Sequence, residues 1–223
     1  SNIVSATAYG IRTAANATTV NGSVNLKSVK ATSGTNGQSA DAAAYGTYSD
    51  RKSLTITGNL TAEAVTADAG TNSAANANAY GIYTGSTTTI NGSVNLTSVK
   101  ATASTTNSSA QANAYGAQNS GKLTVQGDFT ANVTAAAAAG SAAAYGIDNA
   151  SGTTEVDGKV TLNVTADGGS AAANAVSDAS AEAYGVKNAS GQTLTLHKAG
   201  TTSTHSITVT TKGGTAGTAG DTN

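Results

Sequence analysis

The tripeptide Ala-Tyr-Gly occurs six times in this chain of 223 residues. The intervals between successive tyrosines are 36, 35, 35, 30 and 39 residues. These tyrosines are Tyr9, Tyr45, Tyr80, Tyr115, Tyr145 and Tyr184. Self-similarity at such a period is typical of architectures in which each repeat contacts only its neighbours. We therefore interpret residues 1–223 as a single repeat domain, cut from a longer protein.

Each tripeptide is followed by a short polar turn and then by a long run in which apolar and polar residues alternate. In the fifth repeat Val160, Leu162 and Val164 alternate with Thr161 and Asn163. A period of two residues indicates a β-strand with one buried face. The segment after this run is rich in Ala, Asn, Ser and Gly, and we interpret it as a loop that protrudes from each repeat.

A glycine recurs at an inward position of the alternating run in the first five repeats. These residues are Gly22, Gly58, Gly92, Gly127 and Gly158. Glycine inside a strand pattern usually marks a bend or a bulge. We expect these glycines to form the corner at which the chain turns from one sheet to the next.

Polar residues flank the buried position that precedes this glycine, and we expect them to form outward ladders. The first set is Thr19, Thr55, Thr89, Thr124, Glu155 and Thr195, and the second is Asn21, Thr57, Asn91, Gln126, Asp157 and His197. Stacked coils would bring equivalent side chains to about 4.8 Å from one another. Thr and amide side chains at that spacing can form hydrogen bonds along the stack.

One repeat cannot close a core, because its strand edges leave backbone donors and acceptors unpaired. Stacking of successive repeats closes the core and pairs these backbone groups. The sequence therefore predicts an all-β fold, a right-handed parallel β-helix (β-solenoid) of about six coils and roughly 30 Å in length. The alternative is an α+β fold with a helix over Ser170–Ala183, since alanine is the best helix former. That segment lacks an apolar face, which argues against the helix.

Composition and charge exclude several classes of partner. Only 10% of the residues are charged and the net charge is −1, against about 25% charged residues in a typical domain. A nucleic-acid partner is not expected, because binding phosphates needs a basic surface. The chain has no cysteine, which excludes disulfides and thiolate metal sites. No apolar run approaches the roughly 20 residues of a membrane helix, so we expect no membrane insertion by this fragment. Ser1 and Asn2 are consistent with a tag remnant.

The repeated Ala-Tyr-Gly-Ile, as at Ala79–Ile82, precedes TTTINGSVNLTSV and a segment of small residues. This pattern, which covers nearly the whole chain, resembles the passenger region of type V autotransporters. The resemblance implies a right-handed β-helix that a C-terminal membrane barrel carries to the bacterial surface. It also implies an extracellular, cell-surface location. No signal, barrel or autochaperone segment is visible in these 223 residues.

We expect no catalytic, cofactor or metal site. The histidines, His197 and His205, lie outside any nucleophile motif, and a hydrolytic triad needs a histidine beside a serine and an acid.

The densest acidic group is Asp148, Glu155, Asp157 and Asp167. Glycoside hydrolysis needs paired carboxylates, but the equivalent positions of neighbouring repeats hold Thr, Asn and Gln, which favours a solvated face. Calcium-binding nonapeptides are absent, and an ice-binding Thr pair occurs only in the second repeat, at Thr55 and Thr57.

The repeated tyrosines admit two interpretations, a stripe that stacks on sugars or a column that stacks on itself. We favour the structural column. For the whole chain we predict a non-enzymatic adhesin or display stalk, whose partner is a host-cell or matrix surface or a glycan. The alternative is a filament that self-associates through coil ends or sides. An enzyme that acts on polysaccharides is a distant third.

Overall fold

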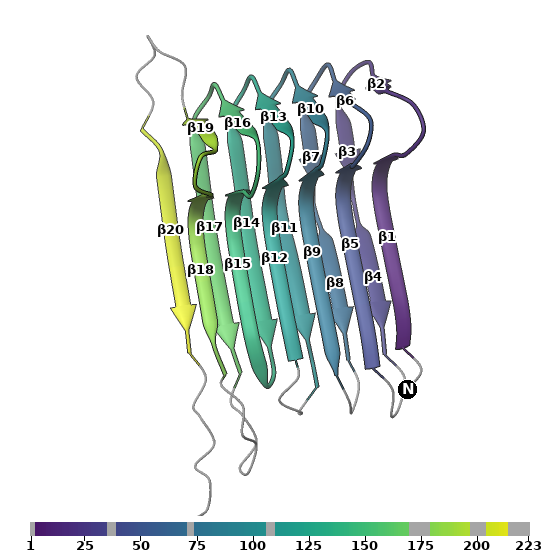
Figure 1. The fold of residues 1–223 in the computed structure, drawn as a ribbon, viewed down its shortest axis with the longest axis vertical. Helices are drawn as coiled ribbons and strands as arrows, with labels where there is room; N and C mark the ends of the chain where they lie inside the picture. The colour runs from purple at the N-terminus through teal and green to yellow at the C-terminus, as the bar shows by residue number, and fades with distance from the viewer. Residues whose placement is uncertain are drawn as a thin grey trace, which may run out of the picture.

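The computed structural model describes residues 3–34, 39–70, 74–105, 110–169, 179–196 and 204–213. Within these ranges the chain is all-β, with parallel strands that stack into a β-solenoid of about five turns. The predicted fold class is therefore confirmed. In Figure 1 the strands run vertically and successive turns are stacked from right to left. The handedness of the coil and a count of six coils stay predictions.

Three parallel sheets run the length of the stack. Sheet A consists of β1 (Ile3–Thr13), β5 (Ser39–Ser49), β9 (Ala75–Thr84), β12 (Ala110–Asn119), β15 (Gly140–Asn149) and β18 (Ala181–Asn188). Sheet B consists of β2 (Thr18–Val20), β6 (Leu54–Ile56), β10 (Thr87–Ile90), β13 (Lys122–Val125), β16 (Thr153–Val156) and β19 (Thr193–Leu196). Sheet C consists of β3 (Val24–Leu26), β4 (Val29–Ser33), β7 (Leu60–Ala62), β8 (Val65–Ala69), β11 (Val94–Ala103), β14 (Phe129–Ala137), β17 (Val160–Gly168) and β20 (Ser206–Lys212).

Each strand pairs with its counterpart in the next repeat. In sheet A, Tyr9 pairs with Tyr45 and Tyr45 with Tyr80, so equivalent residues stand directly above one another. In sheet B, Thr19 pairs with Thr55 and Thr89 with Thr124. The expected outward Thr ladder is thus present, with Glu155 and Thr195 continuing it. This register turns each repeat position into a column along the molecule.

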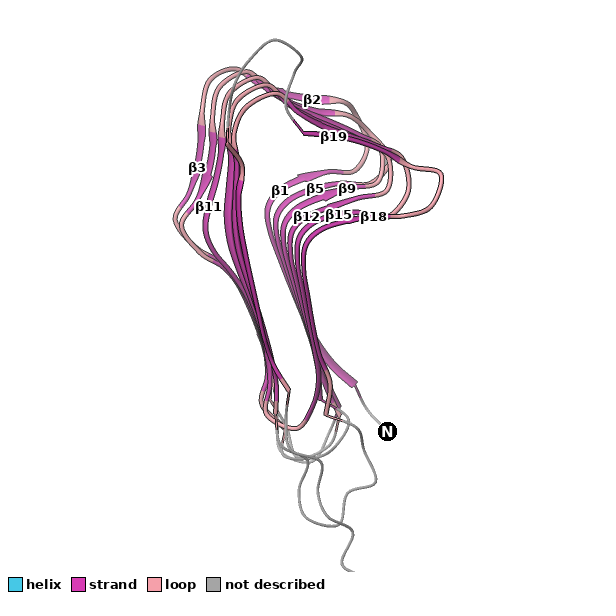
Figure 2. Cartoon of the chain, turned by 90° about the vertical axis from the view of Figure 1, so that its left-hand side faces the viewer, coloured by secondary structure: helices cyan, strands magenta, loops and turns pink. Residues whose placement is uncertain are grey.

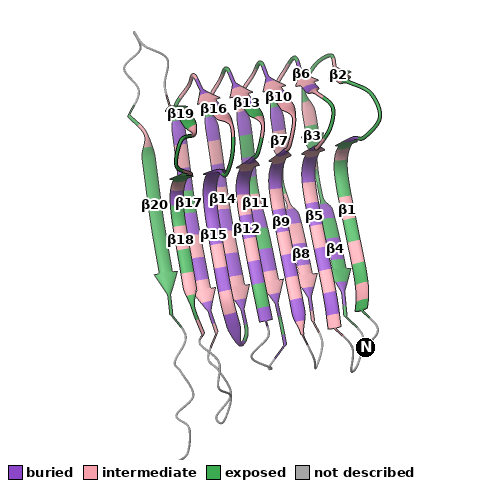
Figure 3. Cartoon of the chain, in the orientation of Figure 1, coloured by how far each residue is buried: buried purple, intermediate pink, exposed green. Residues whose placement is uncertain are grey.

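The core lies between sheets A and C and beneath sheet B. In Figure 3 buried and half-buried residues alternate along the strands of the middle turns. The largest fully buried side chains, among them Phe129, Leu54 and Leu96, occupy the part of the coil near sheet B. The opposite end is lined by alanines, such as Ala42 of β5 and Ala67 of β8. Small side chains let sheets A and C run side by side there, as Figure 2 shows.

The alanine-rich segments were expected to be protruding loops, and that interpretation is wrong. The stretch ANANA before Tyr80 is the first half of β9, in which Ala75, Ala77 and Ala79 are fully buried while Asn76 and Asn78 face outward. The alternation of alanine and asparagine is the period-two pattern of a β-strand, in which the buried apolar residue is the small alanine. These segments pair in register with their neighbours in sheet A.

The helix considered over Ser170–Ala183 finds no support in the described part of that segment. Ala181 begins strand β18, which pairs with β15. Residues 170–178 lie outside the described residues.

Figure 2 shows that the strands of sheet A bend sharply, and their alternation of inward and outward residues is interrupted at the glycine that follows the repeated tyrosine. Gly46 and Thr47 are two successive buried residues, so the alternation of inward and outward side chains shifts by one position. A Cβ atom on Gly46, Gly81 or Gly116 would lie no more than 2.6 Å from the carbonyl oxygen of the next such glycine. We call this bend, between the tyrosine and the end of the strand, the elbow. Only glycine fits it without moving the backbone.

The five glycines predicted to form a corner lie in the connections between sheets B and C. Gly22 is exposed and has a φ of 114°, a left-handed conformation that favours glycine. The others are half-buried, outside the strands rather than at an inward strand position. Backbone hydrogen bonds join them along the stack, as from the Gly58 N–H to the Gly22 carbonyl (2.9 Å).

Substituting a glycine of the elbow is expected to destabilise the fold. In Gly81→Ala the added methyl would lie 2.6 Å from the Gly116 carbonyl oxygen, so we expect the free energy of unfolding to fall by roughly 1–3 kcal/mol. Gly213→Ala, which places a methyl in open space, should change it by less than about 0.5 kcal/mol. Urea denaturation measures both. Equal effects of the two variants would contradict the assigned role of the elbow.

Candidate functional site: the tyrosine column and the elbow

The six repeated tyrosines form a continuous stack on the outer face of sheet A. We call them the tyrosine column. Neighbouring ring centroids are 4.7–5.3 Å apart and the ring planes deviate by 3–12°. Stacked aromatic pairs of this kind are worth about 0.5–1.5 kcal/mol beyond their buried area. The column therefore reinforces the same register that the backbone pairing sets.

This geometry limits what the tyrosines can bind. A sugar stacks on the face of an aromatic ring, but inside the column each face is covered by the next tyrosine. The end residues Tyr9 and Tyr184 are 37% and 39% exposed, whereas Tyr145 is 7% exposed. The Arg12 guanidinium lies 4.9 Å from the Tyr9 ring centroid, and the Lys187 ammonium lies 5.5 Å from that of Tyr184. The column thus presents ring edges and hydroxyls rather than a row of open ring faces.

A second column on sheet A is formed by the residues three positions after each repeated tyrosine, across the elbow. We call it the elbow column, and it consists of Arg12, Tyr48, Tyr83, Gln118, Asp148 and Lys187. Tyr48 stacks on Tyr83 at 5.0 Å and meets Tyr45 edge-on, also at 5.0 Å. The side-chain amide of Gln118 donates to Asp148 (3.4 Å). Unlike the tyrosine column, the elbow column contains several residue types along the stack.

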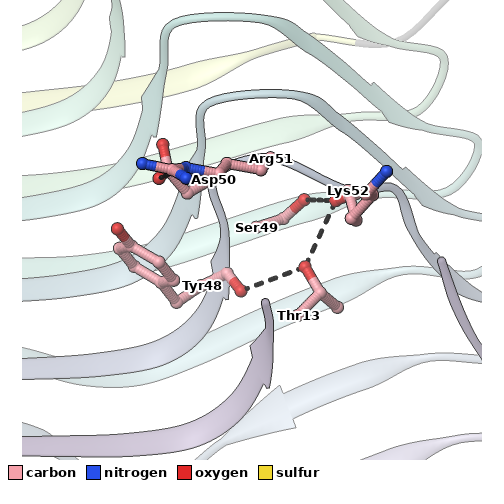
Figure 4. Close-up of polar contacts among 6 residues, drawn as sticks. All are labelled: Thr13, Tyr48, Ser49, Asp50, Arg51 and Lys52. Atoms are coloured by element: carbon pink, nitrogen blue, oxygen red, sulfur yellow. Dashed lines mark hydrogen bonds and ion pairs between the residues drawn. The ribbon is translucent and has the colours of Figure 1, made fainter. Parts of the chain in front are cut away.

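A hollow of about 330 Å³ opens beside the elbow column at the first two turns. Its lining residues are Arg12, Thr13, Ala14, Tyr48, Asp50 and Arg51. Thr13 is buried, and its hydroxyl donates to the carbonyl oxygens of Tyr48 (3.4 Å) and Lys52 (3.2 Å), which fixes the inner wall (Figure 4). The guanidinium Nε of Arg51 lies 3.7 Å from the carboxylate Oδ2 of Asp50. The sequence does not single out these residues, because no motif spans two repeats.

A third column, buried inside the solenoid except for its last member Asn188, fixes the end of sheet A. It runs Thr13, Ser49, Thr84, Asn119, Asn149 and Asn188. The Asn119 side-chain amide is fully buried and donates to Asn149 Oδ1 (3.0 Å) and to the Thr153 carbonyl (2.8 Å). Its Oδ1 accepts from the Gly121 N–H (2.9 Å). This asparagine ladder joins sheet A to sheet B and is structural.

The acidic residues considered as catalytic do not converge. Asp148 lies on sheet A, Glu155 on sheet B and Asp167 at the end of sheet C. Asp167 pairs with the Lys212 ammonium at 3.4 Å. Glu155 continues the outward Thr ladder, and Asp157 lies just beyond the same strand. The described residues contain no group of three or more His, Cys, Asp or Glu side chains placed to hold a metal ion.

One of the two histidines lies within the described residues. His205 Nδ1 accepts a hydrogen bond from the Val160 N–H at 3.1 Å, where it caps the edge of β17. His197 lies outside the described residues. Among the described residues, no helix is long and apolar enough to span a membrane.

Comparisons with protein-family models, characterised proteins and solved structures yield no match to this chain.

Replacing the amide of Asn119 by a carboxylate is expected to be severely destabilising. In Asn119→Asp an acceptor oxygen would replace the NH₂ group that now faces the Asn149 and Thr153 oxygens. We expect a loss of about 3 kcal/mol or more at neutral pH, because a buried charge would lack a donor. Asn163→Asp makes the same change on the exposed outer face and should cost less than about 0.5 kcal/mol. Thermal and urea denaturation would reveal whether the two variants differ.

The tyrosine column predicts a loss of stability at high pH. Burial, followed by the neighbouring tyrosines, raises the pKa of Tyr45, Tyr80 and Tyr115 well above the ordinary value of 10.0. Unfolded tyrosines release their protons near pH 10, while the folded column retains them. The unfolded state then binds fewer protons, so the free energy of unfolding falls as the pH rises above about 10.

Urea denaturation across about pH 9 to 11 measures this fall. Tyr80→Phe keeps the ring in the stack and removes one hydroxyl. The free energy of unfolding of this variant should therefore fall less at high pH than that of the unsubstituted chain. A free energy of unfolding that stays constant across this range would contradict the assignment.

Proposed function

We propose that this chain is part of an extracellular bacterial surface protein of the autotransporter passenger type, in which the solenoid acts as an adhesive display stalk. The observation that carries the proposal is the in-register pairing of each repeat with the next. Because each turn completes the backbone pairing of its neighbour, length grows simply by adding repeats. A low-charge polar exterior suits weak contact repeated along such a stalk.

The outer columns support contact with surfaces or glycans. Asn and Asp side chains join across turns on sheet A, as from Asn76 to Asp41 (2.8 Å) and from Asn113 to Asn78 (3.0 Å). On sheet C, Asn163 donates to Asn132 (2.8 Å). These fixed amides and carboxylates present regularly spaced donors and acceptors beside the tyrosine hydroxyls. Such a surface matches the hydroxyl groups of polysaccharides better than it matches an apolar partner.

The sharpest test of the location is labelling of intact cells. Antibodies raised against this chain are expected to label the natural protein on unpermeabilised cells, and a protease added outside should remove the signal. A cytoplasmic protein of the same cells serves as the control and should be labelled only after lysis. Labelling of this chain only after lysis would contradict the proposal.

The adhesive role is tested with the purified chain on beads. We expect the beads to bind host cells or a glycan array more strongly than beads coated with an Asn78→Ala, Asn113→Ala double variant, which removes one linked amide pair of the outer face. Multivalent display amplifies weak contacts, so a difference of several-fold should be measurable. Binding to no cell or glycan would contradict the adhesive role.

The alternative function is self-assembly, favoured by the exposed strand β20, in which Ile207 and Val209 are each 44% exposed. The column residues argue against head-to-tail stacking of copies. Continued register would place Lys187 of one copy beside Arg12 of the next, about 4.8 Å apart. Like charges directly opposite are destabilising. We therefore expect a monomer in sedimentation velocity at low salt, and fibres under these conditions would favour the filament.

A further inference from the structure

The chain contains two arginines, Arg12 and Arg51, and both line the one hollow beside the elbow. They come from different turns, from the end of β1 and from the connection after β5. Their convergence in a chain with only 10% charged residues needs a physical reason. Neither residue serves the core, because both side chains are exposed.

Neither guanidinium donates a hydrogen bond within the part of the chain that the structure describes, although Arg51 forms an ion pair with Asp50. Among the described residues, Arg12 contacts only the rings of Tyr9 and Tyr48, at 4.9 and 5.9 Å from their centroids. The Nε atom of Arg51 forms an ion pair with Oδ2 of Asp50 at 3.7 Å, a distance too long for a hydrogen bond. Arginine carries five N–H donors in a planar fork that matches a carboxylate bidentately. These cation–π contacts place the Arg12 guanidinium beside the hollow.

The remaining walls supply groups for a hydroxylated ring. Figure 4 shows Tyr48, Asp50 and Arg51 around the connection that leaves β5. The carboxylate of Asp50 can accept hydrogen bonds from sugar hydroxyls. Burial, reinforced by Asp50, raises the pKa of Tyr48, so its hydroxyl keeps its proton at neutral pH and can donate. A volume of about 330 Å³ lies at the small end of the range for ligand sites, which suits a single sugar residue.

We propose that this hollow binds the carboxylate of an acidic sugar, a uronic or sialic acid unit of a surface glycan. The two guanidiniums hold the carboxylate, while Asp50 and Tyr48 bind ring hydroxyls. This assignment rests on the proposed adhesive function, because it names the ligand class that one part of the stalk holds. The site is confined to the first two turns, since the equivalent elbow positions of later turns are Tyr83, Gln118, Asp148 and Lys187.

The test is a titration of the purified chain with D-glucuronate, followed by NMR at an ionic strength of about 0.15 M to suppress nonspecific attraction. We expect saturable binding that Arg12→Ala or Arg51→Ala weakens about tenfold or more. Arg51→Lys should also weaken it, because lysine keeps the charge and loses the fork. Lys100→Ala, on the exposed face of β11, removes one positive charge elsewhere and should leave affinity within about twofold.

Several results would overturn the proposal. They are the absence of saturable binding, equal affinity for neutral D-glucose, binding of glucose 6-sulfate in place of glucuronate, or an Arg51→Ala variant that binds like Lys100→Ala. Unchanged circular dichroism and melting temperature show that each variant is folded.

A glycan array separates this proposal from the adhesive function. If the unsubstituted chain binds acidic glycans and an Arg12→Ala, Arg51→Ala double variant binds them equally well, the hollow is wrong and adhesion stands. If glucuronate binds in the hollow while the chain adheres to no glycan or cell, the site stands and the adhesive function is wrong.

Discussion

Parallel, in-register pairing between successive repeats is the constraint on which the rest of this molecule depends. The four inner strands of sheet A, β5, β9, β12 and β15, each use both edges, one toward the preceding turn and one toward the next, as Tyr45 does between Tyr9 and Tyr80. No turn can close its core or satisfy its backbone alone. The pairing also places each residue about 4.8 Å from its counterpart, so a side chain is tolerated only if it packs well against the equivalent side chains of the neighbouring turns.

That rule explains the unusual composition. Alanine lines the part of the coil where sheets A and C run closest together, while Leu and Phe are reserved for the part beneath sheet B. Tyrosine stacks on tyrosine, and asparagine donates to asparagine, as Asn119 does to Asn149. The glycine of the elbow is forced by the carbonyl of the glycine above it, as Gly46 is by Gly81. Charged residues are rare, because equal charges in one column repel.

The recurring tyrosine was enough to predict stacked turns, columns and an all-β solenoid, because its spacing reports the length of one turn directly. The alanine-rich strands were not predicted because alanine is a poor strand former. In these strands the buried residues that alternate with outward ones such as Asn78 are alanines, whose side chain is only a methyl group. The elbow was missed because a one-residue shift in the alternation looks like a break in the pattern. The hollow could not be predicted from the sequence, for a different reason. Arg12 and Arg51 are 39 positions apart in the sequence, and only the folded register brings them together.

The columns also indicate where recognition can arise in such a fold. A column of identical residues gives every turn the same surface, which suits weak repeated contact but cannot form a local site. A specific pocket needs neighbouring turns to differ. The elbow column meets this requirement, with five residue types in its six positions. It also lies at the bend of sheet A, and at the first two turns it lines the hollow beside the connection to sheet B. Variation at this one position would therefore change ligand preference from turn to turn while the backbone pairing, the alanine core and the tyrosine stack stay the same.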